Sequence, residues 1–570
     1  DSEHLIPQAL LALPVALVGG NPVLCYNLVF LSTFVLSGLG MFLLVRRVTG
    51  HALAAFVGGL LFAFAPYRIP QFSHLQVLSA QWMPFTLLGV RSYVETRRRW
   101  PLLAGGLALV LQNLSCVYYL LYFPPFVAAY VCWELARTGL WRERSTWFDL
   151  AFTSALVFTL TVPLLVPYAL VRADLQFTRS LADVQRMSAD VYSYLTASSA
   201  QRFWGDRLAQ VFPKPEGELF PGLVTPLLAA IGLGAALRAA LRADVPVPQA
   251  VPAWTRLVAL VAGGLCVAHL AAALLTVVER RIVIDLGVTT LRLGNVTQLL
   301  VRGVVAGALC LLVSATARVR AARIARTDAA FLAVGWLAAV WLSFGPTPGV
   351  LGRPLDLASP FLALWTYVPG FDGLRVPARF AMVATLMLSM LGALGASALA
   401  RSGAGRVVLL VLTLGFLYEA GAAPFTVNGM TALTDYVTPE GRLYQGAATP
   451  AVYRAVEALP AAAVLAELPL GQPDYDLRAM FYSTQHWRRL VNGYSGYFPP
   501  HYGRIMLALT QLSRHPDLSL SELRAIGTTH ALVHEGAFLD REGVDTTAAL
   551  RRLGATELFR SGSDVLLALP

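Results

Sequence analysis

The chain has 570 residues, of which 56% are hydrophobic and 14% are charged, and its formal net charge is +11. Soluble chains carry about 25% charged residues, so the composition excludes an ordinary multidomain soluble protein. Apolar runs of about 20 residues recur, and each is long enough to cross a hydrocarbon core of about 30 Å as a helix. The alternating pattern of a membrane β-barrel is missing. The sequence therefore predicts a polytopic α-helical membrane protein.

Twelve membrane spans are predicted in chain order. They cover 22–45, 52–66, 76–93, 102–117, 118–137, 147–171, 221–241, 253–277, 296–316, 328–345, 379–400 and 406–427. The apolar stretch 6–19 is too short to span and contains two prolines, so we expect it to be interfacial or re-entrant. The five cysteines lie in or beside apolar runs without metal-ligand spacing, which predicts small buried side chains.

The loop arginines predict the orientation of these spans. They gather in every second loop, at 46–47, 97–99, 137–144, 238–242, 318–326 and 401–406. By the positive-inside rule these loops are cytoplasmic, so the net charge indicates membrane topology and no nucleic-acid partner. The loop 278–295 also carries arginines and fits the alternation less well. Both ends of the chain are then expected outside, and an external start predicts that a first span and most of an external loop precede Asp1.

The tail differs from the rest of the chain. Strand-like runs at 463–470, 530–536 and 565–570 alternate with helical candidates. This order predicts a small external α/β domain at 428–570, after a transmembrane domain at 1–427.

Polar residues in the predicted external loops are candidates for binding. Arg68 and His74 lie in "APYRIPQFSH", in either a ligand-binding or a structural role. The long loop 172–220 includes Arg202 and Trp204, and arginines with aromatic rings suit an anionic lipid or a sugar. An interfacial amphipathic helix with an aromatic belt is an equal alternative for that loop.

Charged residues beside the predicted spans add to these candidates. In "FDGLRVPARF", Asp372, Arg375 and Arg379 stand at the mouth of a span, which favours a lipid-linked phosphate, and a pairing of Asp372 with an arginine is the alternative. "PEGELFPG" either aims Glu216 and Glu218 at a site or forms a rigid re-entry.

The densest polar and aromatic cluster lies in the tail at "HWRRLVNGYSGY". Its residues could line a saccharide groove or pack the tail onto other loops; they are His486, Trp487, Asn492, Tyr494 and Tyr497. No nucleotide-binding glycine motif, HExxH or GxSxG motif is present, so soluble nucleotide-sugar chemistry has no support.

Several segments together carry a resemblance to a known family. "SEHLIPQALLALPVALVGGNP", "HLQVLSAQWMPF", "LRVPARF" and "HWRRLVNGYSGYFPP" resemble bacterial membrane proteins that are YfhO-like or similar to mannosyltransferases of the GT-C superfamily. The resemblance implies a multi-span glycosyltransferase whose active site lies in external loops and whose donor is a sugar on polyprenyl phosphate. Expected partners are membrane lipids, this donor and a glycan, lipid or protein acceptor.

The resemblance also assigns roles to residues. The family's acid lies in the first external loop, of which only Asp1, Glu3 and His4 are expected to remain here, so its principal acid is expected upstream. Binding of substrate and its phosphate is expected of Arg68, His74, Arg202, Trp204, Asp372, Arg375 and Arg379. The tail cluster is expected to bind the acceptor or its sugar. No metal ligands are assigned, and a divalent cofactor is left open.

Two other classes of protein remain open. A transporter or lipid flippase would need charges along a path at mid-membrane and two related halves, and this chain places its charges mostly at the predicted external face. A non-catalytic envelope scaffold with the same fold is the other alternative. An aspartate in the expected upstream loop would favour the enzyme.

Overall fold

The computed structural model describes residues 3–175, 178–242, 252–279, 282–285, 290–422, 424, 436–494, 502–509, 512 and 515–570. It divides into two compact units. One unit comprises Glu3–Pro14 and Tyr26–Ala423, and the other comprises Asp1–Ser2, Val15–Cys25 and Pro424–Pro570. The boundary at Pro424 lies close to the boundary predicted after residue 427.

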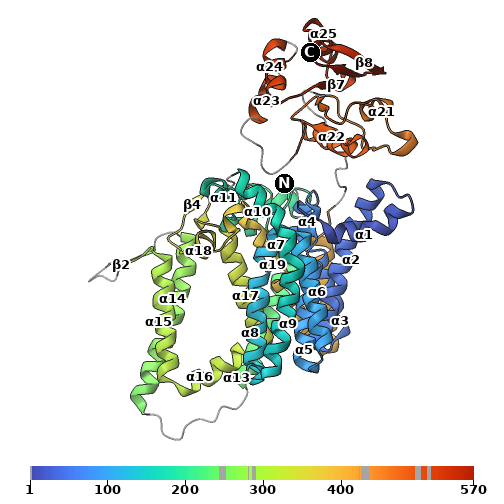
Figure 1. Ribbon diagram of the computed structural model, residues 1–570. Helices are drawn as coiled ribbons and strands as arrows, with labels where there is room; N and C mark the ends of the chain where they lie inside the picture. The colour runs from blue at the N-terminus through green and yellow to red at the C-terminus, as the bar shows by residue number, and fades with distance from the viewer. Residues whose placement is uncertain are drawn as a thin grey trace. The chain divides into compact units, whose positions relative to one another are not determined.

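Helices dominate the chain up to residue 419 (Figure 1). Their bounds are α1 (Ile6–Leu17), α2 (Pro22–Thr49), α3 (Ala52–Ala63), α4 (Leu75–Leu78), α5 (Trp82–Thr96), α6 (Arg99–Ser115), α7 (Val117–Tyr122), α8 (Pro124–Thr138), α9 (Arg144–Thr161), α10 (Val166–Leu175), α11 (Leu181–Arg186), α12 (Gly205–Leu208), α13 (Val224–Arg242), α14 (Ala253–Glu279), α15 (Val296–Val313), α16 (Ala315–Ala325), α17 (Asp328–Ser343), α18 (Pro360–Tyr367), α19 (Ala381–Leu399) and α20 (Gly403–Glu419). Short 3-10 turns include η1 (Pro66–Gln71), η5 (Phe371–Gly373) and η6 (Pro377–Phe380). Two small antiparallel hairpins pair β1 (Ile282–Asp285) with β2 (Thr290–Leu293) and β3 (Gly349–Val350) with β4 (Arg353–Pro354).

Seven helices within the described ranges are long and apolar enough to cross a membrane, or eight if the bent pair of α16 and α17 forms one span. The other predicted spans also contain helices, but α3, α5, α6 and α20 have only 12, 15, 17 and 17 residues. The prediction of a helical membrane protein is therefore confirmed at the level of these seven or eight spans.

The outer helices expose large apolar side chains. Phe148 on α9, Leu260 on α14 and Leu312 on α15 are 63%, 75% and 74% exposed. Extensive exposed apolar surface of this kind marks contact with a membrane or a partner. The centre of the unit is α19, which is buried along most of its length and packs against α3, α13 and α17.

The contact between α13 and α19 depends on glycine. A Cβ at Gly232 would lie 2.7 Å from the backbone N of Gly395 and from the carbonyl O of Leu391, so these two helices touch through their backbones. Small residues at helix contacts allow such close approach in membranes.

Replacing Gly232 by alanine is expected to force α13 and α19 apart and to lower the unfolding free energy by about 1–3 kcal/mol. Gly234→Ala is the matched control. Gly234 lies on the same helix as Gly232, and a Cβ there would meet no neighbouring atom within 4 Å. Thermal unfolding of the full chain in detergent measures both variants. Equal midpoints for the two would show that α13 and α19 do not pack this closely.

Ion pairs join several helices at one end of the bundle, which we call the arginine-rich end. Arg91 on α5 contacts Glu134 on α8 at 3.0 Å and Asp328 at the start of α17 at 3.1 Å. Arg99 at the start of α6 contacts Asp149 on α9 at 2.6 Å. The ends of α5 and α8 and the starts of α6, α9 and α17 therefore lie at the same level, and α16 continues this end with further arginines (Figure 1).

The C-terminal unit contains a five-stranded sheet in the order β6-β5-β7-β9-β8. Its elements are α21 (Ala451–Glu457), β5 (Val464–Leu468), α22 (Pro473–His486), β6 (Arg489–Leu490), α23 (Tyr502–Leu509), α24 (Pro516–Ala525), β7 (His530–His534), α25 (Glu542–Arg552), β8 (Thr556–Ser561) and β9 (Asp564–Ala568). Strands β6, β5 and β7 are parallel, and β9 is antiparallel to both β7 and β8.

Alternate residues of these strands enter two separate cores. Leu465, Leu532 and Leu566 pack with residues of α21 and α22 on one face. Ala466 and Val533 pack with residues of α23, α24 and α25 on the other face. Helices therefore cover both faces, as the period of two in a β-strand requires when both sides are buried.

Candidate functional site

A buried ion pair between Arg379 and Glu216 forms the centre of the candidate site. The Arg379 Nη2 atom lies 2.5 Å from Glu216 Oε1, and Nε lies 3.3 Å from Oε2. Arg379 is 5% exposed, and the side chain of Glu216 is 14% exposed. The two-pronged contact matches the planar guanidinium to the carboxylate, and it joins η6, at the start of α19, to the loop before α13.

Neighbouring side chains hold this pair in place. Gln71 Nε2 donates to Glu216 Oε2 at 3.1 Å, and the Arg379 guanidinium lies 4.5 Å from the centre of the Tyr118 ring. Glu216 itself has a φ of 57°, in the left-handed region that a non-glycine residue rarely adopts. Such a conformation costs on the order of 1–3 kcal/mol and persists where the surroundings impose it, often at functional sites.

Glu3 reaches the same region from the N-terminal segment. Its carboxylate accepts a hydrogen bond of 3.0 Å from the backbone N–H of Val117, the first residue of α7. Burial raises the pKa of Glu3, against the opposing effects of the Val117 N–H and the charge of Arg379. The nearby Gln8 donates to the carbonyl of Ser115 at 3.0 Å and so ties this segment to the end of α6.

The other titratable groups of the site respond to the same charges. Burial alone would raise the pKa of Glu216, but the charge and hydrogen bonds of Arg379 outweigh it and lower that pKa. Burial and then the positive charge of Arg379 lower the pKa of His74, so His74 is neutral at pH 7. Two carboxyl groups whose pKa values move in opposite directions are suited to different roles. Glu216 stays ionised as the partner of Arg379, while Glu3 can exchange a proton nearer neutral pH.

Arg375 is the cation of this region that remains available. It is half-buried, it forms no ion pair with any acid in the described ranges, and its charge acts on His74. Arg379 is already neutralised by Glu216. An anion that enters the site would therefore meet Arg375 as the unpaired positive charge.

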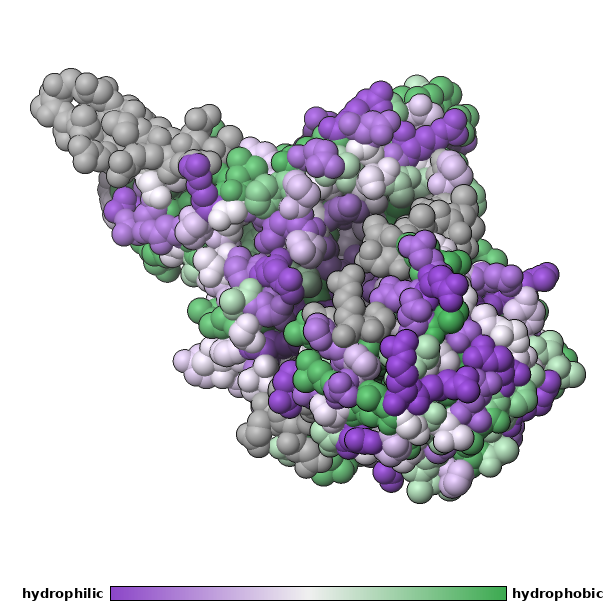
Figure 2. Space-filling model, turned by 90° about the horizontal axis from the view of Figure 1, so that it is seen from above, coloured by the Kyte–Doolittle hydropathy of each residue, from purple (hydrophilic) through white to green (hydrophobic). Residues whose placement is uncertain are grey.

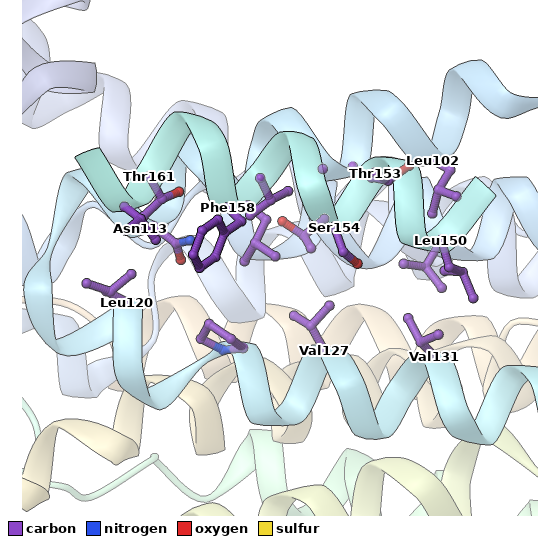
Figure 3. A pocket seen from close by; sticks show the side chains of 18 of the residues that line it. Leu102, Asn113, Leu120, Val127, Val131, Leu150, Thr153, Ser154, Phe158 and Thr161 are labelled. Atoms are coloured by element: carbon purple, nitrogen blue, oxygen red, sulfur yellow. The ribbon is translucent and has the colours of Figure 1, made fainter. Parts of the chain in front are cut away.

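An apolar groove of about 340 Å³ lies between α6, α8 and α9. Phe158 and Ser154 from α9 face Val127 and Val131 from α8 across this space (Figure 3). Asn113, near the end of α6, lines it as well. This end of the groove is the end at which Gln8 and Glu3 contact Ser115 and Val117.

The short helix α7 connects the groove with the ion pair. Leu120 lines the groove, while Tyr118 packs under Arg379 and the N–H of Val117 binds Glu3. The apolar space and the charged groups therefore share one element of six residues. This end of α6 is opposite to Arg99 and hence opposite to the arginine-rich end.

Other residues predicted to bind substrate make contacts within the protein. Arg68 is 1% exposed and its guanidinium contacts the hydroxyls of Thr33 and Ser37 on α2 and the carbonyl of Leu78, at 3.2, 3.4 and 3.1 Å. It also packs over the ring of Phe34. Through these contacts Arg68 joins η1 to α2 and to the end of α4.

Two more candidates from the loops, Asp372 and Trp204, also make contacts within the protein. Asp372 pairs with Arg172, the alternative that the sequence left open. The Trp204 indole donates to Glu419 at 3.1 Å, and Glu419 also accepts the N–H groups of Leu223 and Val224 at the start of α13. Glu419 thereby caps a helix N-terminus, where a negative charge is favoured.

Two further candidates, Arg202 and His4, make other contacts. Arg202 exposes its side chain and bonds through its backbone N–H to the carbonyl of Gly421. His4 packs the edge of its ring against Tyr168, with 4.8 Å between ring centres. Asp1 lies outside the described residues.

The described residues of the predicted sugar-binding cluster in the tail differ in their burial and contacts. Asn492 is buried and bridges the backbone of Glu467 and the carboxylate of Asp476, and His486 is also buried. Trp487 and Tyr494 are 79% and 52% exposed. Asn492 therefore acts within the fold of the unit, and Tyr497 lies outside the described residues.

Glu216 was predicted either to face a site or to lie in a rigid re-entry, and no role in binding was assigned to it. Its place between Pro215 and Gly217 just before a span singled it out without showing its partner. Tyr118 and Gln71 carry no sequence signal, because they lie within ordinary apolar or turn sequence. No group of three or more His, Cys, Asp and Glu side chains within the described ranges is placed to hold a metal ion.

The fold and the site together define a polytopic helical membrane protein with a buried charged cluster beside an apolar groove. Residues 7–299 match the family described as a domain of unknown function, DUF6311, and this match covers more than half of the chain. The chain therefore belongs to the DUF6311 family. The matched region includes Glu216 and the whole groove, while Arg375 and Arg379 follow it. No curated protein matches the chain.

Proposed function

We propose that this protein is a membrane glycosyltransferase that moves a sugar from a polyprenyl-phosphate donor to an extracytoplasmic acceptor. One observation carries the proposal: Glu3 and the unpaired Arg375 lie in the charged cluster around Arg379, and α7 joins that cluster to an apolar groove. A lipid-linked donor requires both an apolar surface for its chain and a cation for its phosphate. The resemblance to GT-C proteins agrees with this chemistry.

The proposed orientation places the charged cluster outside a bacterial inner membrane. Arginines collect at the opposite end of the bundle, which the positive-inside rule assigns to the cytoplasm. We also propose twelve crossings, because the shorter helices connect the same two ends. For example, the 17 residues of α6 span about 25 Å between Arg99 and Ser115. The C-terminal unit then lies outside.

The proposed reaction is an inverting displacement at the anomeric carbon. The acceptor oxygen forms a bond to this carbon while the bond from the carbon to the phosphate oxygen breaks. Glu3 takes the proton of the acceptor hydroxyl, and polyprenyl phosphate leaves with the bonding electron pair. A buried carboxyl whose pKa is raised suits such general-base catalysis, and Arg375 stabilises the charge of the leaving phosphate.

A turnover assay tests the proposed function. The full chain is reconstituted in liposomes with undecaprenyl phosphate carrying radiolabelled glucose, mannose, galactose or arabinose, and an envelope extract supplies acceptors. We expect label to leave at least one lipid donor and to appear in an acceptor at a rate proportional to the protein. Retention of the label on all four donors would contradict the proposal.

A further inference from the structure

A cleft of about 470 Å³ lies in the C-terminal unit, within residues 437–564. Its lining is mostly polar and includes Glu467, His534 and Asp564, together with Tyr453 and Arg478. Hydrophilic residues are abundant on the side of the molecule drawn in Figure 2. Of these five side chains, only Glu467 lies in a segment that the sequence offered beside the predicted saccharide cluster, "ELPLGQPDYD".

The register of the sheet brings three of these residues together. Glu467 and His534 lie at the carboxyl ends of the parallel strands β5 and β7, and Asp564 at the start of β9 pairs directly with His534. All three alternate in phase with Leu465, Leu532 and Leu566, so they share the face that α21 and α22 cover. Clefts beyond the carboxyl ends of parallel strands are common ligand sites.

His534 is held between the two carboxylates. Its Nδ1 lies 2.8 Å from Asp564 Oδ1, and its Nε2 lies 3.2 Å from Glu467 Oε2. Burial alone would lower the pKa of His534, but the hydrogen bonds to Asp564 and Glu467 raise it to about 9. A protonated His534 therefore fixes both acids in place at neutral pH.

Glu467 has an oxygen that lacks a partner. Tyr453 donates to Oε2 at 3.0 Å, whereas Oε1 is buried and has no hydrogen-bond partner among the described residues. Glu467 is only 2% exposed. A buried carboxylate oxygen without a donor is costly, so a ligand in the cleft that donates a hydrogen bond to this atom would remove that cost.

The charges of the lining restrict the chemistry of that ligand. Three carboxylates, from Glu440, Glu467 and Asp564, and two cations, Arg478 and protonated His534, line the cleft. The excess of acids disfavours a phosphate or another anion. A neutral polyhydroxylated molecule fits, because each hydroxyl can donate to a carboxylate and accept from the guanidinium, and three tyrosines in the lining supply aromatic surface.

We infer that this cleft binds a saccharide, with the unpartnered oxygen of Glu467 accepting a hydrogen bond from a sugar hydroxyl. The inference stands apart from sugar transfer, since it concerns only the C-terminal unit and needs no lipid donor. Binding and transfer can therefore fail independently.

Saturation-transfer NMR on the full chain in nanodiscs tests the inference. The probes are glucose, galactose, mannose, N-acetylglucosamine and their homodisaccharides, without any donor lipid. We expect at least one probe to bind and Glu467→Gln to weaken its binding at least tenfold. Asp474→Asn is the control, because Asp474 is an exposed acid on α22 that does not line the cleft, and it should bind like the wild type.

A second variant keeps the test decisive if Glu467→Gln unfolds the unit. Ser563 lines the cleft and is exposed, so Ser563→Phe fills the space without disturbing a core. It should also abolish binding. Absence of binding by all probes would overturn the inference, as would binding that survives Ser563→Phe. Competition by ethanolamine in place of any saccharide would instead indicate an ammonium ligand and overturn it as well.

Discussion

Replacing Glu3 by glutamine is expected to slow sugar transfer by about 10²–10⁴-fold, the usual contribution of general acid–base catalysis. Glutamine keeps an oxygen that can accept the hydrogen bond of 3.0 Å from the Val117 N–H, so the segment should remain docked. What it loses is the ability to take a proton from the acceptor hydroxyl. The measurement is the release of labelled sugar from its lipid donor in liposomes, with thermal unfolding to verify the fold.

The pH dependence adds a readout that a structural role would not change. Because burial raises the pKa of Glu3, its basic form is lost at a higher pH than that of an ordinary glutamate. Turnover of the wild type should therefore rise with pH through this pKa, and Glu3→Gln should lack that rise. Glu218→Gln is the control, since burial also raises the pKa of Glu218, which lies two residues beyond Glu216. Equal turnover of Glu3→Gln and Glu218→Gln would show that Glu3 is not the general base.

Replacing Glu216 by glutamine is expected to lower the unfolding free energy by about 3–5 kcal/mol, which is the cost of breaking a buried ion pair. The change leaves the charge of Arg379 without a partner in a place where that residue is only 5% exposed. The midpoint of thermal unfolding in detergent should fall accordingly. Part of the loss should return in the double variant Glu216→Gln/Arg379→Gln, because no uncompensated charge then remains.

An exposed ion pair provides the comparison. Glu143 pairs with Arg97, and their side chains are 49% and 34% exposed. Glu143→Gln should change the unfolding free energy by at most about 1 kcal/mol, since exposed pairs contribute little. If Glu216→Gln lowered the unfolding free energy no more than Glu143→Gln does, the Arg379–Glu216 pair would not be the buried ion pair that the structure shows.

The helices could be predicted from the sequence because long apolar runs leave few alternatives. The predicted spans 22–45 and 253–277 lie within α2 and α14. The span 52–66 was predicted too long, because Pro66 begins η1 and α3 already ends at Ala63. Local breaks of this kind depend on turns, which hydrophobicity does not reveal.

The site could be predicted only in part, because its residues come from distant segments. Glu3, His74, Arg375 and Arg379 were each singled out by local charge or position. Their grouping around Glu216 requires a contact across 163 positions, which no local pattern encodes. The same holds for the C-terminal cleft, whose residues become neighbours only through the strand order β5-β7-β9.

Arg68 shows how a structural contact escapes a local pattern. Its position in a predicted external loop left a ligand-binding or a structural role open, and in the structure Thr33 and Ser37 lie on one side of α2 and accept its hydrogen bonds. Two hydroxyl residues four positions apart in an apolar helix are a weak signal for a buried polar partner. Their meaning appears only when the facing residue is known.

The binding of undecaprenyl phosphate tests the proposed donor site most directly, because this lipid is common to all the donors tested whatever sugar they carry. The measurement compares its dissociation constant for the full chain in detergent with that of Arg375→Ala, and uses undecaprenol as the ligand without phosphate. Arg353→Ala is the control, since Arg353 is an exposed arginine on β4 and is not one of the predicted binding residues. A lost charge-assisted hydrogen bond should weaken binding at least about tenfold. We expect Arg375→Ala to raise the dissociation constant of undecaprenyl phosphate and the control variant to leave it unchanged. An unchanged dissociation constant in Arg375→Ala would contradict the account.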